Sequence, residues 1–295
     1  MNPELLTMLL LLLATVIIAV IIIPYFLYKK LNHNEETYPA WLKSIGFSVA
    51  ELMFVFVNLC LILVFNQLTM IPGLILALYI ILLYNLKTKQ KELVVEKNKK
   101  YLSAFLVVFI SHLILLMLNR SIGYINNDNS WLMNTLYILP FNITLLFMYF
   151  FKVGFKDFKW NMTKKTIALA LLLYLILKLL TFVLFDIEKL TSTSWLYYLV
   201  NFAHNIYYPA FTEEILFRGL LLTGLIHYGF SNSKANIIHA LIFGVIHILN
   251  RGDLGLVELL STSMQMYLGY LLGKLYLSTK SLSPNILLHG LFNVI

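Results

Sequence analysis

The sequence predicts an all-α protein, a polytopic transmembrane bundle of about 8–10 helices. Of its 295 residues, 60% are hydrophobic and 12% are charged, and the mean hydropathy is +0.82. This composition excludes a pair of soluble domains, which the length alone would allow. The apolar residues also form long runs between short polar loops, as membrane-spanning helices do. We expect helices near residues 5–28, 46–66, 69–86, 101–118, 135–151, 166–185, 196–226, 236–249, 255–277 and 284–295.

Three of these runs differ from a simple span. Residues 5–28 lack a basic n-region and are too long for the core of a signal peptide, so we expect a retained membrane anchor. Residues 196–226 are too long for one span, and Pro209 is expected to kink this run or to divide it into two helices. The final run, 284–295, is short for a full crossing.

The distribution of lysine predicts the orientation in the membrane. Three, six and five lysines fall in residues 29–44, 87–100 and 152–165. The loops between these segments hold at most one basic residue each. By the positive-inside rule, the lysine-rich loops are cytoplasmic and the N-terminus is outside. The net charge of +8 is then explained by the loops, not by binding to nucleic acid. The Lys-, Asn- and Ile-rich composition favours a multi-pass protein of a bacterial plasma membrane.

Several other residues have simple structural interpretations. Cys60 is the single cysteine, so the chain has no disulfide framework and no cysteine metal cluster. Lys178 falls inside an apolar run, where its amine either snorkels or meets a polar partner. Gly269 and Gly273 form a GxxxG pattern, which favours close packing of helices. Four histidines are interpreted as hydrogen-bonded packing residues: His112, His204, His227 and His239.

The last third of the chain contains three pairs of polar or aromatic residues spaced four apart. Residues at this spacing share one face of a helix. On insertion scales each charge at the centre of a membrane helix costs roughly 2.5–3.5 kcal/mol, so two Glu and one Arg facing lipid would cost roughly 8–10 kcal/mol. Charges retained at that cost indicate a functional site. The residues are Glu213, Glu214 and Arg218 in FTEEILFRG, Phe243 and His247 in FGVIH, and His289 and Asn293 in HGLFN.

The two adjacent glutamates can take different roles. Glu214 is placed to pair with Arg218, which would keep its carboxylate ionised. Glu213 points elsewhere around the helix, where it could act as a general base. His247, on another helix, could share a water molecule with Glu213 and polarise it.

The remaining pair completes one of two possible chemistries. His289 and Asn293 offer an imidazole and an amide from one helix face, which are suitable donors for a developing oxyanion. Together with the glutamate base, they indicate hydrolysis of an acyl bond. The alternative is a zinc site with Glu213, His247 and His289 as ligands and water in the fourth position. The residue pattern does not distinguish between the two.

The order EExxxR, FxxxH, HxxxN resembles the CPBP intramembrane protease family, also called the Abi or CAAX-protease and bacteriocin-processing family. The segments PAFTEEILFRGLL and LGYLLGKLYLSTKSLSPNILLHGLFNVI are similar to the first and closing motifs of that family. The resemblance covers residues 205–295 and implies a helical membrane core that encloses a conical cavity. Because the motif residues cluster in the last third, the chain is expected to divide into N-terminal helices, residues 1–195, and a catalytic core, residues 196–295.

The resemblance implies a role for each motif residue. Glu213 would activate water together with His247, and His289 with Asn293 would stabilise the oxyanion. Glu214 and Arg218 would support the site, and Phe243 would support it by shaping the pocket. The family is often labelled as metalloproteases, but its eukaryotic prenyl-protein endopeptidase branch is understood to work without bound metal, so both Zn²⁺ and no cofactor are compatible with the resemblance.

The expected function is therefore that of an intramembrane endopeptidase. Its partners would be the lipid bilayer and a peptide or membrane-protein substrate, with no nucleic acid. The alternative is a non-catalytic membrane scaffold or regulator, such as a bacteriocin self-immunity protein. The complete set of motif residues favours the enzyme, because a scaffold has little reason to retain two His, an Asn and a Glu pair.

Overall fold

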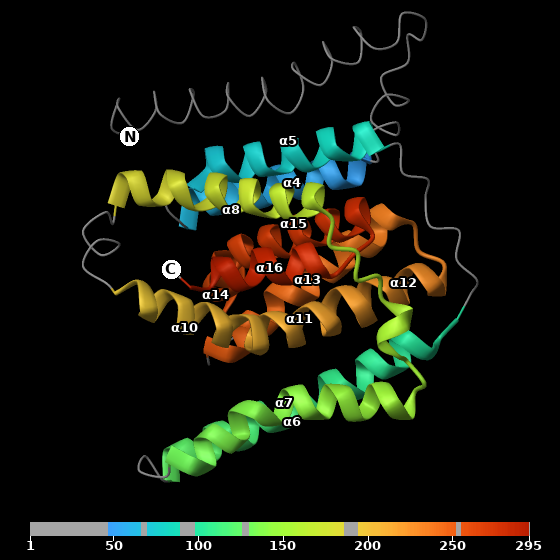
Figure 1. Ribbon diagram of the computed structural model, residues 1–295, viewed down its shortest axis with the longest axis vertical. Coiled ribbons are helices and arrows are strands. Elements are labelled where there is room, and N and C mark those ends of the chain that lie inside the picture. The colour runs from blue at the N-terminus through green and yellow to red at the C-terminus, as the bar shows by residue number, and fades with distance from the viewer. Residues whose placement is uncertain are drawn as a thin grey trace, which may run out of the picture.

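The protein is all-α throughout the residues that the computed structural model describes, which confirms the predicted fold class (Figure 1). These residues are 47–65, 70–88, 98–125, 130–185, 194–251 and 255–294. The expected anchor at 5–28 lies outside them. The α-helices are α4 Val49–Phe65, α5 Ile71–Thr88, α6 Lys100–Ile125, α7 Ser130–Phe150, α8 Lys164–Phe185, α10 Trp195–Asn205, α11 Thr212–Glu214, α12 Thr223–Tyr228, α13 Asn232–Arg251, α14 Leu256–Ser261, α15 Ser263–Thr279 and α16 Ser283–Phe292. The residues before α11, Ile206–Phe211, contain a break at Tyr208, a π-helical segment, Ile215–Leu222, follows α11, and a 3₁₀ turn occupies Phe155–Asp157.

The long run 196–226 is divided where Pro209 predicted a break. Tyr208, the residue before the proline, has an extended backbone (φ −151°, ψ 126°) between two helical segments. A residue that precedes proline is pushed toward such angles by the proline ring. After the break the helix continues from Pro209 to Tyr228 and carries the EExxxR motif in its first half.

The described residues do not show the membrane spans that the sequence predicted. Within the described ranges, no helix is both long enough and apolar enough to cross a membrane. The last helix, α16, has only 10 residues, in keeping with the short final run of the sequence.

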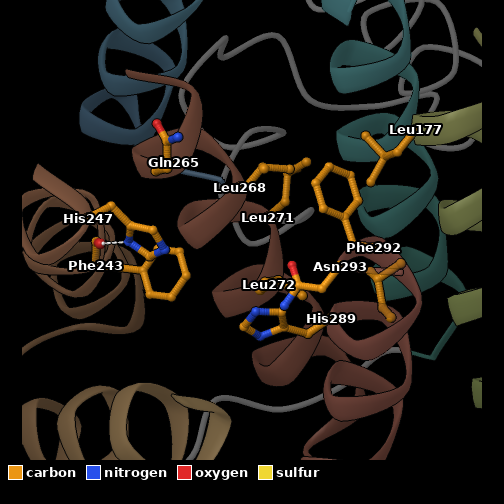
Figure 2. A pocket seen from close by; sticks show the side chains of 11 residues that line it. Leu177, Phe243, His247, Gln265, Leu268, Leu271, Leu272, His289, Phe292 and Asn293 are labelled. Carbon is orange, nitrogen blue, oxygen red and sulfur yellow. Dashed lines mark hydrogen bonds between the residues drawn. The ribbon is translucent and has the colours of Figure 1, made fainter. Parts of the chain in front are cut away.

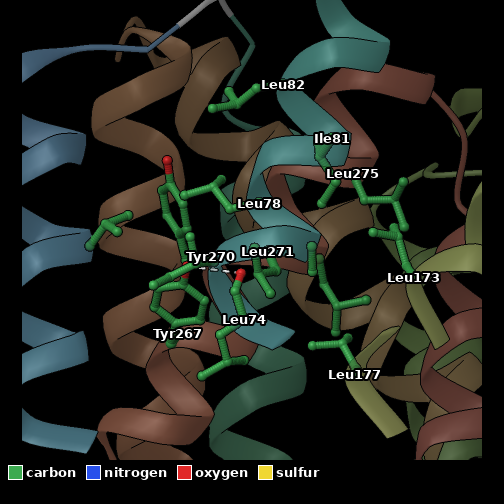
Figure 3. Packing of buried hydrophobic residues seen from close by; sticks show 14 of the residues in the cluster. Leu74, Leu78, Ile81, Leu82, Leu173, Leu177, Tyr267, Tyr270, Leu271 and Leu275 are labelled. Carbon is green, nitrogen blue, oxygen red and sulfur yellow. Dashed lines mark hydrogen bonds between the residues drawn. The ribbon is translucent and has the colours of Figure 1, made fainter. Parts of the chain in front are cut away.

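The helices that carry the motifs lie in the middle of the molecule (Figure 1). On one side of α13, α15 and α16 is a layer of α4, α5 and α8, and on the other side are α10 and the helix that starts at Pro209, followed by the α6–α7 pair. Figure 3 shows Tyr267 and Tyr270 of α15 beside Leu74 and Leu78 of α5, and Leu275 of α15 near Leu173 of α8. Both tyrosines are fully buried, so α15 forms the centre of this core.

A buried ion pair ties α4 to the central helices. Ser48 and Glu51 form a capping box at the start of α4, with 2.8 Å from the Ser48 amide to the Glu51 carboxylate and 3.2 Å from the Glu51 amide to the Ser48 hydroxyl. The same carboxylate accepts hydrogen bonds from Lys274 Nζ (2.8 Å), the Tyr270 hydroxyl (3.2 Å) and the Ser233 hydroxyl (2.6 Å). A buried carboxylate with this many donors is fully compensated, so Glu51 fixes α4 against α13 and α15.

The GxxxG pattern of α15 allows the close packing that it predicted. A Cβ added to Gly269 would lie 2.8 Å from the Phe243 ring of α13. A Cβ added to Gly273 would overlap the side-chain oxygen of Asn236, also on α13. The two helices can therefore approach closely only because both positions lack side chains.

We expect Gly273→Ala to lower the stability of the protein by about 1–3 kcal/mol, the usual cost of overpacking a tight interface. The melting temperature of the purified protein in detergent measures this. Gly154→Ala is the matched control, because the nearest atom to its new Cβ is 3.9 Å away. Equal melting temperatures for the two variants would contradict the close packing of α13 on α15.

Candidate active site

Part of the EExxxR segment forms a π-helix, whose turns are wider than those of an α-helix. From Ile215 to Leu222 the turns are π-helical, and the amide of Thr223 donates to the carbonyl of Arg218, five residues earlier. Such π-helical turns occur frequently at functional sites. This segment places the carboxylate of Glu214 and the guanidinium of Arg218 toward the central helices, both with fully buried side chains.

Glu214 is the most highly coordinated carboxylate of the motifs. Its Oε1 accepts hydrogen bonds from Arg218 Nη1 at 3.0 Å and from His289 Nδ1 at 2.7 Å. Its Oε2 accepts one from Asn285 Nδ2 at 3.3 Å. Three donors, one of them cationic, stabilise the ionised form of a buried carboxylate. The predicted Glu214–Arg218 pair is thus confirmed, and Glu214 also orients His289.

The guanidinium of Arg218 is held on three sides. Besides Glu214, its Nη2 donates to the carbonyl of Gly269 at 3.3 Å. Its plane lies over the Phe243 ring, with 4.5 Å from Cζ to the ring centroid. Such a cation–π contact compensates part of the lost hydration of a buried cation. Arg218 therefore links α13, α15 and the EExxxR helix at one point.

Glu213 faces a different group from its neighbour. Its Oε2 lies 3.7 Å from Nε2 of His289, just beyond hydrogen-bond distance, and this buried atom has no hydrogen-bond partner among the described residues. The Glu213 side chain remains 25% exposed, whereas Glu214 has no exposed surface. An unpartnered carboxylate oxygen next to an oriented imidazole is the arrangement in which a water molecule can be held and deprotonated.

A cavity of about 200 Å³ opens beside the two motif histidines (Figure 2). His247 of α13 and His289 of α16 line it on different sides, as Figure 2 shows. The remaining walls are mostly aliphatic and come from α8, α13, α15 and the end of α16: Leu177, Phe243, Gln265, Leu268, Leu271, Leu272, Leu288, Phe292 and Asn293. The cavity thus combines two imidazoles with an apolar chamber.

The tautomer of His247 is set by its own helix. Its Nδ1 lies 2.7 Å from the carbonyl of Phe243, which can only accept, so Nδ1 carries the hydrogen. In the neutral ring, Nε2 is then the acceptor. His247 can accordingly accept a hydrogen bond from a water molecule and take up its proton.

The sequence predicted that Glu213 and His247 share one water molecule. In the structure no hydrogen bond or ion pair joins these two described residues, whereas Glu213 lies 3.7 Å from His289. The ring of Phe243 contacts both histidines, with centroid distances of 4.6 Å to His247 and 6.4 Å to His289. The two imidazoles are thus arranged around Phe243, and whether a water bridges Glu213 and His247 stays a prediction.

Asn293 occupies the end of α16, beside His289 in Figure 2. Its backbone N–H donates a hydrogen bond to the carbonyl of His289 at 3.2 Å, so Asn293 lies one helical turn after His289. Its exposed side chain lines the cavity. His289 and Asn293 therefore present their polar groups to the same space, as their spacing predicted.

The zinc alternative needs Glu213, His247 and His289 as a ligand set. Among the residues that the structure describes, no group of three or more His, Cys, Asp or Glu side chains could hold a metal ion. The ring of Phe243 contacts both imidazoles. The donor arrangement does not fit a zinc site, so we derive no step through a metal.

Asn285 is a site residue that the sequence patterns did not identify. It is fully buried, and its Nδ2 donates both to Glu214 Oε2 at 3.3 Å and to the carbonyl of Leu272 at 2.6 Å. A signal was available, since Asn285 precedes His289 by four residues and shares its helix face. Asn285 and His289 together hold Glu214 from α16.

We expect Asn285→Ala to lower turnover about tenfold and stability by about 1–3 kcal/mol, because a buried acceptor on Glu214 and one on Leu272 each lose a donor. Turnover and melting temperature of the purified variant measure both effects. Ser283→Ala, at the start of the same helix, is the control and should match the parent. A normal turnover in Asn285→Ala would show that Glu214 does not need this support.

Four residues outside the motifs can be compared with their predicted interpretations. His112 is hydrogen-bonded as expected, with its Nε2 3.0 Å from the carbonyl of Pro140. His239 is fully buried and its ring packs against Phe217 and Phe243, as expected for a packing residue. Lys178 has its amine 4.3 Å from the ring centroid of Phe292. Cys60 is a free, exposed thiol.

The motif segment also matches a known family. The model of the family "Type II CAAX prenyl endopeptidase Rce1-like" matches residues 194–295. Searches of curated proteins and of solved structures return no match for this chain. The family is one of CAAX-type intramembrane proteases, and the match confirms the resemblance drawn from the three motifs. The segment that contains Glu213, Glu214, Arg218, Phe243, His247, His289 and Asn293 is therefore similar to the Rce1-like type II CAAX prenyl endopeptidases, whose family model covers about a third of this chain.

Proposed function

We propose that this protein is an intramembrane endopeptidase that hydrolyses peptide bonds of membrane-associated peptides or proteins, with a water molecule activated by Glu213 and His247. The observation that carries the proposal is the unpartnered Oε2 of Glu213, 3.7 Å from an imidazole that Glu214 orients. The neighbouring cavity offers a second imidazole and room for a substrate side chain. The family match supports the same class of activity.

In the first step a water molecule loses a proton to Glu213 as its oxygen attacks the carbonyl carbon of the scissile bond. His247 accepts a hydrogen bond from this water through Nε2 and helps to aim its lone pair. The product of the attack is a tetrahedral intermediate with a negatively charged oxygen. When the carbon–nitrogen bond breaks, the proton held by Glu213 passes to the amine that leaves.

His289 and Asn293 are placed to stabilise the negative oxygen. With Nδ1–H donating to Glu214, His289 can donate from Nε2 only as an imidazolium. The amide of Asn293 supplies a second donor to the same oxyanion.

The apolar part of the cavity and the outer surface indicate the kind of substrate. Five leucines and Phe292 line the chamber beside the histidines, so an aliphatic or aromatic side chain fits there. Large apolar side chains are also exposed on several helices, including Val64 on α4, Met117 on α6 and Tyr149 on α7. Such a surface suits contact with lipid. We therefore expect the protein to reside in the bilayer and to cleave apolar, membrane-proximal segments.

The proposal is tested by incubating the full chain, purified in detergent, with a library of apolar peptides and identifying new termini by mass spectrometry. We expect cleavage at defined bonds. A parallel reaction with a strong chelator should proceed at the same rate, because no step requires a metal. If the protein cleaves no peptide and no membrane-protein segment, the alternative of a non-catalytic scaffold takes the place of the enzyme.

A further inference from the structure

The cavity beside the two motif histidines has one wall from outside the segment that the family model matches. That segment is residues 194–295, whereas the lining residue Leu177 belongs to α8, which ends at Phe185. α8 packs against α16, the helix that carries His289. One of the N-terminal helices therefore borders the space in which we place the reaction.

Leu177 lies away from the groups that act on the scissile bond. Figure 2 shows His247 and Phe243 on one side of the cavity and Leu177 beside Phe292 on the other. Leucines of α15 line the space between them. The scissile bond has to lie near the histidines, so a substrate side chain that enters the cavity extends toward Leu177.

The wall around Leu177 is held in place. Leu177 is buried and belongs to the same core cluster as Leu173 and Leu288. The amine of Lys178, the next residue of α8, lies 4.3 Å from the ring centroid of Phe292. This cation–π contact restricts the ring that stands beside Leu177. Closely packed interiors respond to the gain or loss of a single methylene, so this wall can select an occupant by size.

The volume of the cavity limits its occupant to one side chain of moderate size. An apolar cavity of about 150 Å³ lined by Leu, Ile and Phe binds benzene. This cavity has about 200 Å³, and the peptide group beside the histidines takes part of that volume. The remainder suits one branched aliphatic side chain. A charged side chain would lose its hydration there without a compensating partner on the aliphatic wall.

We propose that Leu177 sets the size of the substrate side chain, and that the cavity takes one aliphatic side chain of about leucine size next to the scissile bond. The inference rests on the proposed peptidase function for the reaction. Binding of the side chain can be measured without cleavage.

The experiment uses the full chain in neutral detergent micelles. The probes are N-acetyl-Gly-Gly-Xaa-Gly-Gly-amide peptides with Ala, Leu or Trp as Xaa, so that only Xaa offers a side chain to the cavity. The rise in melting temperature with probe concentration reports binding, and mass spectrometry reports cleavage next to Xaa. The variants are Leu177→Ala and Leu177→Phe. Leu173→Ala is the matched control, because it removes the same atoms one turn earlier on α8 from a buried residue that does not line the cavity.

We expect the parent to bind the Leu probe at least about tenfold more tightly than the Ala probe, since one methylene in an apolar pocket already discriminates roughly 10- to 200-fold. Leu177→Phe fills part of the cavity and should lower this ratio about tenfold. Leu177→Ala enlarges the cavity and should raise the ratio of Trp to Leu binding about tenfold. Leu173→Ala should keep both parental ratios. Partition of the probes into micelles is the same for every variant and cancels in these comparisons.

Separate outcomes bear on the pocket and on the reaction. Parental ratios in both Leu177 variants would overturn the inference, and cleavage of the probes would still support the peptidase. Ratios that change as expected without any cleavage would support the side-chain pocket and count against the peptidase.

The control decides whether the effect belongs to the cavity. If Leu173→Ala shifted the ratios as much as Leu177→Ala, general loosening of the core would explain the result and the inference would fail. Should both alanine variants fail to fold, the opposite change in Leu177→Phe, measured against the parent, gives the same test. Absence of binding by every probe would overturn the inference as well.

Discussion

Glu213→Gln should abolish peptide cleavage while leaving the fold intact, and His247→Ala should do the same. Glutamine keeps the shape of Glu213 but cannot take a proton from water. Alanine at His247 removes the acceptor nitrogen that faces the cavity. Among the described residues, the ion-pair contact of Glu213 with His289 is long, at 3.7 Å, and His247 has none. Both replacements should therefore leave the packing of the helices intact. Residues that act on one water are not additive, so the double variant should be hardly slower than either single one.

Initial rates on a peptide cleaved by the parent measure these losses, and melting temperatures confirm that the variants are folded. Glu258→Gln and His204→Ala are matched controls, because they make the same chemical changes away from the cavity lining. Activity that persists in both Glu213→Gln and His247→Ala would falsify the proposed mechanism. If a biological phenotype also persisted in these variants, the scaffold function would replace the peptidase.

Contacts within one helix could be predicted from the sequence. The four-residue spacing of Glu214 and Arg218 indicated their pair, and that of Phe243 and His247 indicated a shared face. In the structure the first pair is an ion pair of 3.0 Å, and His247 bonds to the carbonyl of Phe243 at 2.7 Å. Both contacts depend only on the pitch of the helix, which the spacing already contains.

Contacts between helices could not be predicted in the same way. His289 was expected to act with Asn293 as an oxyanion donor, and the spacing did not indicate that its Nδ1 also bonds to Glu214 on another helix. Asn285 joins the same carboxylate from one turn away and was not identified. Which side chain meets which across two helices depends on their rotation and depth of packing, and a single sequence does not specify these.

Buried charges in the first part of the chain show the same limit. Glu51 lies in an apolar run, and its sequence context explains only its capping box with Ser48. Its ion pair with Lys274 joins residues more than 200 positions apart. The sequence suggests a clear division between N-terminal helices and a catalytic core. In the structure this division is less sharp, because α4 is hydrogen-bonded directly to α13 and α15.

Arg218→Ala should destabilise the protein by about 3–5 kcal/mol, because it leaves the carboxylate of Glu214 buried without its cation. His289 and Asn285 would remain as donors, but the carbonyl of Gly269 would lose its partner and the ring of Phe243 its cation. We expect a lower yield of folded protein, a lower melting temperature and a loss of cleavage, since Glu214 orients His289.

A double-mutant cycle separates the charge from the packing. Glu214→Gln added to Arg218→Ala removes the unpaired carboxylate and should restore part of the lost stability, whereas it should not restore cleavage. Arg218→Lys keeps the charge but not the two-sided contact to Glu214 and Gly269, so its stability should lie between the parent and Arg218→Ala. If Arg218→Ala melted like the parent, Arg218 would have to face water. The cluster of Glu214, His289 and Asn285 would then be held by hydrogen bonds alone.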